Sequence, residues 1–182
     1  EEYGPDNWLK AVNNENFRKS IYYALDREAA VMTSYPYEYK EQMLNTITVK
    51  NFVNVDGVDY TELEPLKDIT NTEQFQPDLA LEYKEKAMAE LSGTVEFPVI
   101  VVLPYSTGNL GLTNRVQVEK QQLENLLGND YITVELVPYP PTNYLKESRS
   151  SGQFSLMEMG WGPDYTDPAG YVEVMTHDTS IG

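Results

Sequence analysis

The stretch FSLMEMGWGPDYTDP, residues 154–168, decides how the rest of the chain is interpreted. Its apolar first half predicts a strand that runs into Gly-Trp-Gly-Pro, and an acidic turn follows. Asp167 and Pro168 then predict the start of a helix, because Asp is a favoured N-cap residue and Pro is favoured at the first helical position. The predicted order is therefore strand, loop and helix, and we interpret the loop as a ligand site.

The residue types in this loop suit a partly hydrated binding site. Gly160 and Gly162 would let another backbone approach closely, because they lack a Cβ atom. Trp161 and Tyr165 offer apolar faces with a polar tip, although plain core packing of Trp161 stays open. Asp164 is suited to an ammonium group, through a charge-assisted hydrogen bond. These five residues are the candidate ligand-binding residues of the loop.

The second half of the chain alternates between strand and helix patterns. A continuous apolar run over residues 97–103 predicts a strand covered on both faces. A helix that stops at Gly128, a strand over 131–137, a short helix over 142–150 and the strand from Phe154 follow. This alternation predicts an α/β fold with a largely parallel sheet and flanking helices.

Ligands of parallel α/β sheets bind beyond the carboxyl ends of the strands. That rule selects two loops here, one over residues 105–114 and the other over residues 162–166. Both loops contain Gly and polar residues. We therefore add Tyr105 and Asn114 from the first loop to the candidate ligand-binding residues.

The first half of the chain contains two predicted helices separated by a less regular segment. One helix begins at Asn13 or Asn14, with an apolar stripe at helical spacing, and the other runs from Pro77 to a stop at Gly93. Residues 33–76 carry little regular pattern. Within them Asp56 and Gly57 predict the two-residue turn of a small hairpin.

Composition argues against several functional classes. With 13 basic and 29 acidic residues the net charge is −16, which would repel nucleic acid and anionic membrane surfaces. There is no cysteine, so thiol catalysis and Cys-based zinc sites are excluded, and His177 is the single histidine. No apolar run has the length of a membrane-spanning helix. We predict no cofactor and no bound metal.

Two other functional classes remain as alternatives. Asp164 and Asp167 could form the acid and base of a carbohydrate-active hydrolase. Asp167 is better explained as an N-cap, so we favour a binding protein over an enzyme. A surface adhesion module would instead use the acidic exterior of the protein.

Three segments together resemble the extracellular solute-binding proteins, family 5, in particular the oligopeptide-binding surface lipoproteins of Gram-positive bacteria. Residues 16–29, NFRKSIYYALDREA, resemble a helix motif of this family, with Ser20 where Ala is usual. Residues 160–168, GWGPDYTDP, resemble its strand-to-loop signature, and residues 52–57 also resemble the family. The resemblance covers nearly the whole chain and implies the second lobe of a class II periplasmic-binding-protein-like fold.

The resemblance also implies a function. Residues 1–182 would form a single lobe of a two-lobe protein that captures oligopeptides for an ABC permease, with the first lobe outside this sequence. The protein would be a monomer, either lipid-anchored on the extracellular face of the membrane or periplasmic. Family members that bind nickel, haem or sugars leave the ligand class open.

The resemblance assigns roles to the candidate residues. Asp164 would pair with the peptide's α-ammonium group, and the backbone at Gly160–Gly162 would pair with the peptide as an added strand. Trp161 would line the cavity. Some relatives have an Arg where this chain has Glu158, so the anchor for a peptide carboxylate would differ here.

Overall fold

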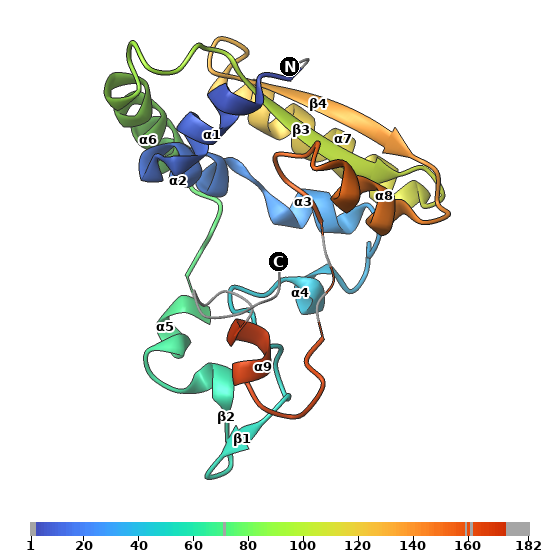
Figure 1. Cartoon of the computed structure of the whole chain (residues 1–182). Helices are drawn as coiled ribbons and strands as arrows, with labels where there is room; N and C mark the ends of the chain where they lie inside the picture. The colour runs from blue at the N-terminus through green and yellow to red at the C-terminus, as the bar shows by residue number, and fades with distance from the viewer. Residues whose placement is uncertain (1–2, 71, 159, 161, 174–182) are drawn as a thin grey trace. The chain divides into compact units, whose positions relative to one another are not determined.

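The computed structural model describes residues 3–70, 72–158, 160 and 162–173. The chain divides into two compact units, and we describe each by itself. The larger unit comprises Glu1–Gln42 and Gln74–Glu158, and the smaller unit comprises Met43–Glu73 and Met159–Gly182. Figure 1 shows the helices and strands of both units.

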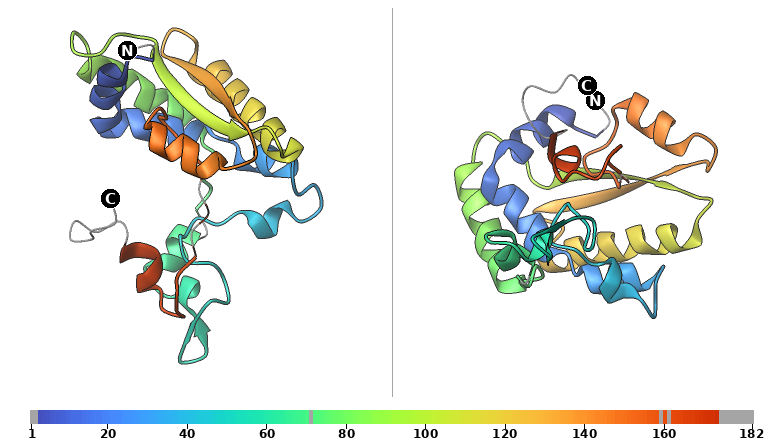
Figure 2. Two further views of the ribbon diagram at one scale, coloured as in Figure 1. Left: turned by 45° about the vertical axis from the view of Figure 1, so that its right-hand side comes forward. Right: turned by 90° about the horizontal axis from the view of Figure 1, so that it is seen from below.

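The larger unit is an α/β structure, as predicted. Its strands β3 (Val99–Ser106) and β4 (Ile132–Tyr139) are parallel, in a register that pairs Val99 with Ile132 and Ser106 with Tyr139. Helix α7 covers one face of this pair and α8 covers the other (Figures 1 and 2). The helices of this unit are α1 (Pro5–Asn13), α2 (Glu15–Ala24), α3 (Arg27–Met32), α4 (Tyr39–Gln42), α6 (Pro77–Glu90), α7 (Leu110–Leu127) and α8 (Tyr144–Ser151).

The predicted helix signals are borne out at several ends. The Asn14 side chain caps α2 by accepting a hydrogen bond of 2.8 Å from the backbone N–H of Phe17. Helix α6 begins at Pro77 as expected, and α7 ends before Gly128, which has a positive φ of 86°. The apolar stripes of these helices supply much of the core, which includes Phe17, Ile21, Ala80, Ala87, Val116, Leu123 and Leu127.

The loop predicted over residues 104–114 is much shorter in the structure. Pro104 and Tyr105 lie inside β3, and α7 begins at Leu110, so only residues 107–109 connect the two elements. Successive residues of a strand direct their backbone N–H and C=O groups to opposite edges. A strand therefore tolerates Pro104, which has no N–H, if that residue faces the edge away from the paired strand. Pro104 faces away from β4, and the Tyr144 hydroxyl donates a hydrogen bond of 2.9 Å to its carbonyl. The Pro that we expected to end the strand therefore removes no β3–β4 hydrogen bond.

The third strand predicted from Phe154 is not formed in the described residues. The segment lies along the outer edge of β3, where the backbone N–H groups of Ser155 and Leu156 donate to the Val102 carbonyl at 2.8 and 3.2 Å. The Ser155 hydroxyl accepts the Val102 N–H at 2.9 Å. The Ser155 hydroxyl oxygen thus accepts the hydrogen bond that a backbone carbonyl would accept in a regular strand. The hydrogen-bond ladder of the sheet therefore does not continue along this segment.

The outer edge of β4 is also satisfied by side chains. Glu124 of α7 accepts a hydrogen bond of 2.8 Å from the Val134 N–H, and Lys120 donates to the Val134 carbonyl. Lys120 and Glu124 contact each other at 2.7 Å, one helical turn apart. This pair therefore replaces the neighbouring strand that the Val134 backbone would otherwise need.

The smaller unit contains short elements, in line with the low regularity expected for much of residues 33–76. The predicted hairpin is present, and Asp56 and Gly57 in its turn have positive φ values of 52° and 83°. The Phe52 ring meets the Tyr171 ring edge to face, with 5.2 Å between the centroids. The elements of this unit are β1 (Asn54–Val55), β2 (Val58–Asp59), the 3₁₀ helix η1 (Tyr60–Glu62), α5 (Leu66–Thr70) and α9 (Ala169–Val172).

Candidate functional site

The candidate residues are divided between the two units. Gly160, Gly162, Asp164 and Tyr165 belong to the smaller unit, whereas Tyr105 and Asn114 belong to the larger one. Trp161 lies outside the described residues, and so does His177.

The loop that contains Asp164 is held at its C-terminal end. The Asp167 carboxylate accepts a hydrogen bond of 2.8 Å from the Ala169 N–H, and the Asp167 N–H donates to the Tyr165 carbonyl at 2.8 Å. Gly170 leaves room for Pro163, because a Cβ atom at Gly170 would lie 2.7 Å from the Pro163 Cβ. Asp167 thus acts at the helix start as predicted, while α9 itself begins at Ala169.

Asp164 is the exposed carboxylate of this loop. In the part of the chain that the structure describes, no hydrogen bond or ion pair engages its side chain. The Tyr165 side chain next to it is 56% exposed. The loop therefore presents a free carboxylate beside an accessible aromatic ring, which is the chemistry that an ammonium ligand requires.

The two candidates of the larger unit have different surroundings from those expected. Tyr105 lies in β3, half-buried and packed against the core, in register with Pro138 of β4. Asn114 lies in the second turn of α7 and is exposed. The prediction that both belong to one loop was wrong, since β3 and α7 extend into the segment from either side.

A pocket that the sequence did not predict lies in the larger unit, where α3 ends and α7 begins. We call it the polar pocket, and its volume is about 450 Å³. Arg115 of α7 forms an ion pair there with Glu158. Arg115 and Glu158 are 43 residues apart, so no local pattern in the sequence indicated this pair. The polar pocket is lined by Thr33, Ser34, Tyr35, Asn109, Gly111, Leu112, Arg115 and Glu158.

Glu119 is the half-buried acid of this region. Burial raises its pKa from the ordinary value of 4.5 to about 7, Arg115 opposes that shift and Glu158 adds to it. Near neutral pH a large share of the Glu119 side chain is therefore protonated. Arg115 then has Glu158 as its charged partner.

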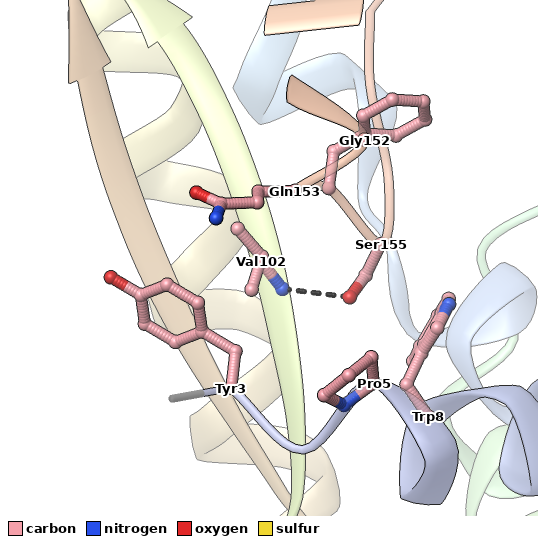
Figure 3. Close-up of a pocket in the computed structure, with 8 residues that line it drawn as sticks. Tyr3, Pro5, Trp8, Val102, Gly152, Gln153 and Ser155 are labelled. Atoms are coloured by element: carbon pink, nitrogen blue, oxygen red, sulfur yellow. Dashed lines mark hydrogen bonds between the residues drawn. The ribbon is translucent and has the colours of Figure 1, made fainter. Parts of the chain in front are cut away.

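A second pocket, of about 320 Å³, lies at the outer edge of β3. Figure 3 shows Trp8 and Pro5 of α1 on one side, with Gly152 and Gln153 on the other and the Val102–Ser155 hydrogen bond between them. The pocket marks the place beside β3 where the third strand was expected.

The described residues contain no cluster of three or more acidic or histidine side chains that could hold a metal ion. The Asp59 carboxylate instead accepts hydrogen bonds from the Thr61 N–H at 2.9 Å and from the Asn51 N–H at 2.6 Å. The pKa of Asp59 is lowered most by a hydrogen bond from the Thr61 side chain, and the two backbone hydrogen bonds lower it further. Asp59 thus stabilises the hairpin. None of the helices among the described residues combines the length and apolarity needed to cross a membrane.

Comparison with known proteins identifies the family. The model of the bacterial extracellular solute-binding proteins, family 5, middle region, matches residues 7–182. The chain therefore belongs to this family of extracellular proteins. The family consists of solute-binding proteins and not of enzymes, so the hydrolase alternative built on Asp164 and Asp167 is not supported.

Individual relatives agree with this assignment. The chain is 26% identical over 190 residues to the oligopeptide-binding protein AliB of Streptococcus pneumoniae serotype 4, and 29% identical over 190 residues to the oligopeptide-binding protein SarA of Streptococcus gordonii. Each match covers 91% of this chain and 28% of the relative, so the chain spans little more than a quarter of their length.

The fold is also shared with solved structures. The substrate-binding domain of an oligopeptide ABC transporter from Bacillus anthracis superposes with a TM-score of 0.73 at 20% identity. The superposition covers 92% of this chain and 30% of that chain. The predicted periplasmic-binding-protein-like fold is confirmed by this match.

Proposed function

We propose that this chain is the ligand-binding lobe of a two-lobe protein that captures oligopeptides for an ABC importer. The family match over residues 7–182 supports solute binding, and the names of the streptococcal relatives support peptides as the solute. The chain matches 28% of those relatives, which leaves ample length for another lobe. Residues 1–182 form one lobe in this proposal, and closure of the two lobes buries the peptide.

Asp164 is the anchor for the peptide's α-ammonium group. The single observation that supports this role most strongly is its exposed carboxylate, which has no partner among the described residues. Within the part of the chain that the structure describes, an ammonium group would therefore break no existing ion pair of Asp164. A hydrogen bond between charged groups of this kind contributes about 1.5–3 kcal/mol.

The other candidates complete the site. The backbone at Gly160 and Gly162 pairs with the peptide main chain as an added strand, which makes recognition tolerant of peptide sequence. Trp161 and Tyr165 shape the cavity around the first peptide residues. Tyr105 and Asn114 of the larger unit are further candidates for contact with the peptide.

The partners and location follow from the same proposal. The loaded protein delivers its peptide to an ABC permease, and a monomer is sufficient for that task. The extracellular character of the family supports a location outside the cytoplasmic membrane. A lipid anchor in the full-length protein keeps it beside the permease.

Calorimetric titration of the full-length protein with a mixed hexapeptide pool tests this proposal. We expect Asp164→Asn, and N-acetylation of the peptides, each to lower affinity by at least about tenfold. Asp167→Asn is the matched control, because it makes the same chemical change in the same loop. That control should keep both the affinity for peptides and the cap at the start of α9, because Asn is about as good a capping residue as Asp.

Two results would overturn parts of the proposal. Peptide binding that is insensitive to both Asp164→Asn and acetylation would remove the role of Asp164. Failure of every peptide to bind would leave the family assignment without a peptide ligand, and sugars, nickel chelates and haem would be titrated next.

A further inference from the structure

The polar pocket contains a buried cation with an exchangeable partner. The Arg115 side chain is 19% exposed, whereas that of its partner Glu158 is 49% exposed. The Arg115 Nε is buried and has no hydrogen-bond partner within the described residues. The two members of this ion pair therefore differ in how easily each could return to water.

Removing Arg115 from its carboxylate partner would be costly. A largely buried guanidinium group that loses its counter-ion keeps its charge, since its pKa is too high for it to deprotonate. Glu158 can leave at lower cost, because half of its side chain is already exposed. Glu119 is a poor substitute near neutral pH, because burial favours its protonated form.

The place of the polar pocket fits a ligand. It lies beyond the carboxyl end of β3 and at the beginning of α7, where ligands of parallel α/β sheets bind. Its volume of about 450 Å³ can accept a carboxylate together with one residue of a peptide. Arg115 is the one basic side chain among the described residues that line it.

We propose that Arg115 binds a carboxylate of the ligand, and that Glu158 is an internal competitor that occupies Arg115 in the free protein. The inference rests on the proposed peptide-binding function and adds a second charged anchor to it. On binding, the ligand carboxylate replaces Glu158 as the partner of Arg115, and Glu158 turns to solvent. Arg115 keeps one carboxylate partner throughout, so no buried charge is left alone.

The competitor role makes an unusual prediction about Glu158. Removing an acidic residue from a protein of net charge −16 would raise its affinity for any anion a little, by long-range attraction. Removal of Glu158 in particular should raise the affinity for carboxylate ligands by about tenfold, because the competing ion pair is lost. Glu147→Gln is the matched control, since Glu147 is exposed on α8 and lies outside the polar pocket.

The test uses the full-length protein and three synthetic hexapeptide pools that lack Asp and Glu at their random positions. One pool has a free C-terminus, one has a C-terminal amide, and the third has the amide together with one fixed Glu. Binding is measured by calorimetry for the wild type, Arg115→Gln and Glu158→Gln. Arg149→Gln, which removes an exposed basic residue of α8, is the charge-matched control for Arg115→Gln.

We expect the amide pool to bind the wild type about tenfold more weakly than the free pool. Arg115→Gln should remove that difference, and Glu158→Gln should strengthen binding of the free pool and not of the amide pool. A difference between the free and amide pools assigns the carboxylate to the peptide's C-terminus, and tighter binding of the fixed-Glu pool than of the amide pool shows that Arg115 accepts a side-chain carboxylate. Thermal melts of each variant check that the fold is kept.

Three outcomes would overturn all or part of the inference, and they are distinguishable. Equal binding of all three pools to the wild type would overturn the role of Arg115 while leaving peptide capture in place. Binding of none of the pools would overturn the proposed function, and the inference with it. A Glu158→Gln variant that behaves like Glu147→Gln would remove the competitor role by itself.

Discussion

The Ser20 hydroxyl lies 3.0 Å from the Tyr131 hydroxyl, and both side chains are completely buried. Ser20 donates its own proton to the Phe17 carbonyl at 2.7 Å, so Tyr131 is the donor to Ser20. This contact links α2 to the residue before β4. Burial raises the pKa of Tyr131 to about 12, so its hydroxyl stays protonated and able to donate.

We predict that Ser20→Ala lowers the free energy of unfolding by about 1–3 kcal/mol, because the buried Tyr131 hydroxyl loses its acceptor. Tyr131→Phe should cost about 1 kcal/mol, since Ser20 keeps its bond to Phe17. The double variant should be less destabilised than the sum of the two, which urea unfolding would measure. Strictly additive effects would mean that the two hydroxyls do not interact.

Glu119 predicts a pH dependence of stability. Its pKa is about 7 in the folded protein and near its ordinary value of 4.5 when unfolded, so the folded state binds the proton more tightly. The stabilisation is complete below pH 4.5 and is lost as the pH rises towards 7 and beyond. The whole difference corresponds to no more than roughly 3 kcal/mol.

Glu119→Gln should remove this dependence, because an amide does not titrate. We expect the unfolding free energy of the variant to exceed that of the wild type increasingly between pH 4.5 and 7, and by a constant amount at higher pH. Urea unfolding across this pH range measures the difference directly. Glu147→Gln on α8 is exposed and should track the wild type at every pH. A flat difference for Glu119→Gln would contradict the assignment.

The pair of Lys120 and Glu124 at the outer edge of β4 predicts a local effect. Glu124→Ala would leave the Val134 N–H without its acceptor and should cost about 1–3 kcal/mol. Hydrogen exchange of the Val134 amide should accelerate in this variant. Glu135→Ala, at the neighbouring exposed position of β4, should leave that amide as protected as in the wild type. Unchanged exchange in Glu124→Ala would show that the edge is covered in another way.

The parts of the fold that the sequence predicted are those determined by neighbouring residues. The Asn14 cap, the Gly128 stop and the turn at Asp56 and Gly57 each depend on a few consecutive residues, and each was predicted. Pro104 was misjudged because its effect depends on which edge of β3 it faces. That orientation follows from the pairing with β4, which local patterns do not contain.

In the candidate site, too, the sequence predicted only the features that depend on neighbouring residues. The loop that contains Asp164 was predicted from consecutive residues. The cap at Asp167 was predicted in the same way, from the preference for Asp at the start of a helix. The pairing of Arg115 with Glu158 joins positions 43 residues apart, so spacing along the chain gives no sign of it. Ser155 likewise replaced a ladder bond with its hydroxyl, although the apolar run around it is typical of a strand.

The contact between Phe52 and Tyr171 predicts that the hairpin region supports the Asp164 loop. Tyr171 is 8% exposed and its ring meets Phe52 edge to face, five residues beyond the end of the acidic loop at residue 166. Phe52→Ala would remove this support, and the loop would have to be ordered when a peptide binds. We expect the Kd for the peptide pool to rise by roughly threefold to tenfold. Tyr171→Phe keeps both rings and should bind like the wild type, whereas an unchanged Kd in Phe52→Ala would show that peptide binding does not depend on this contact.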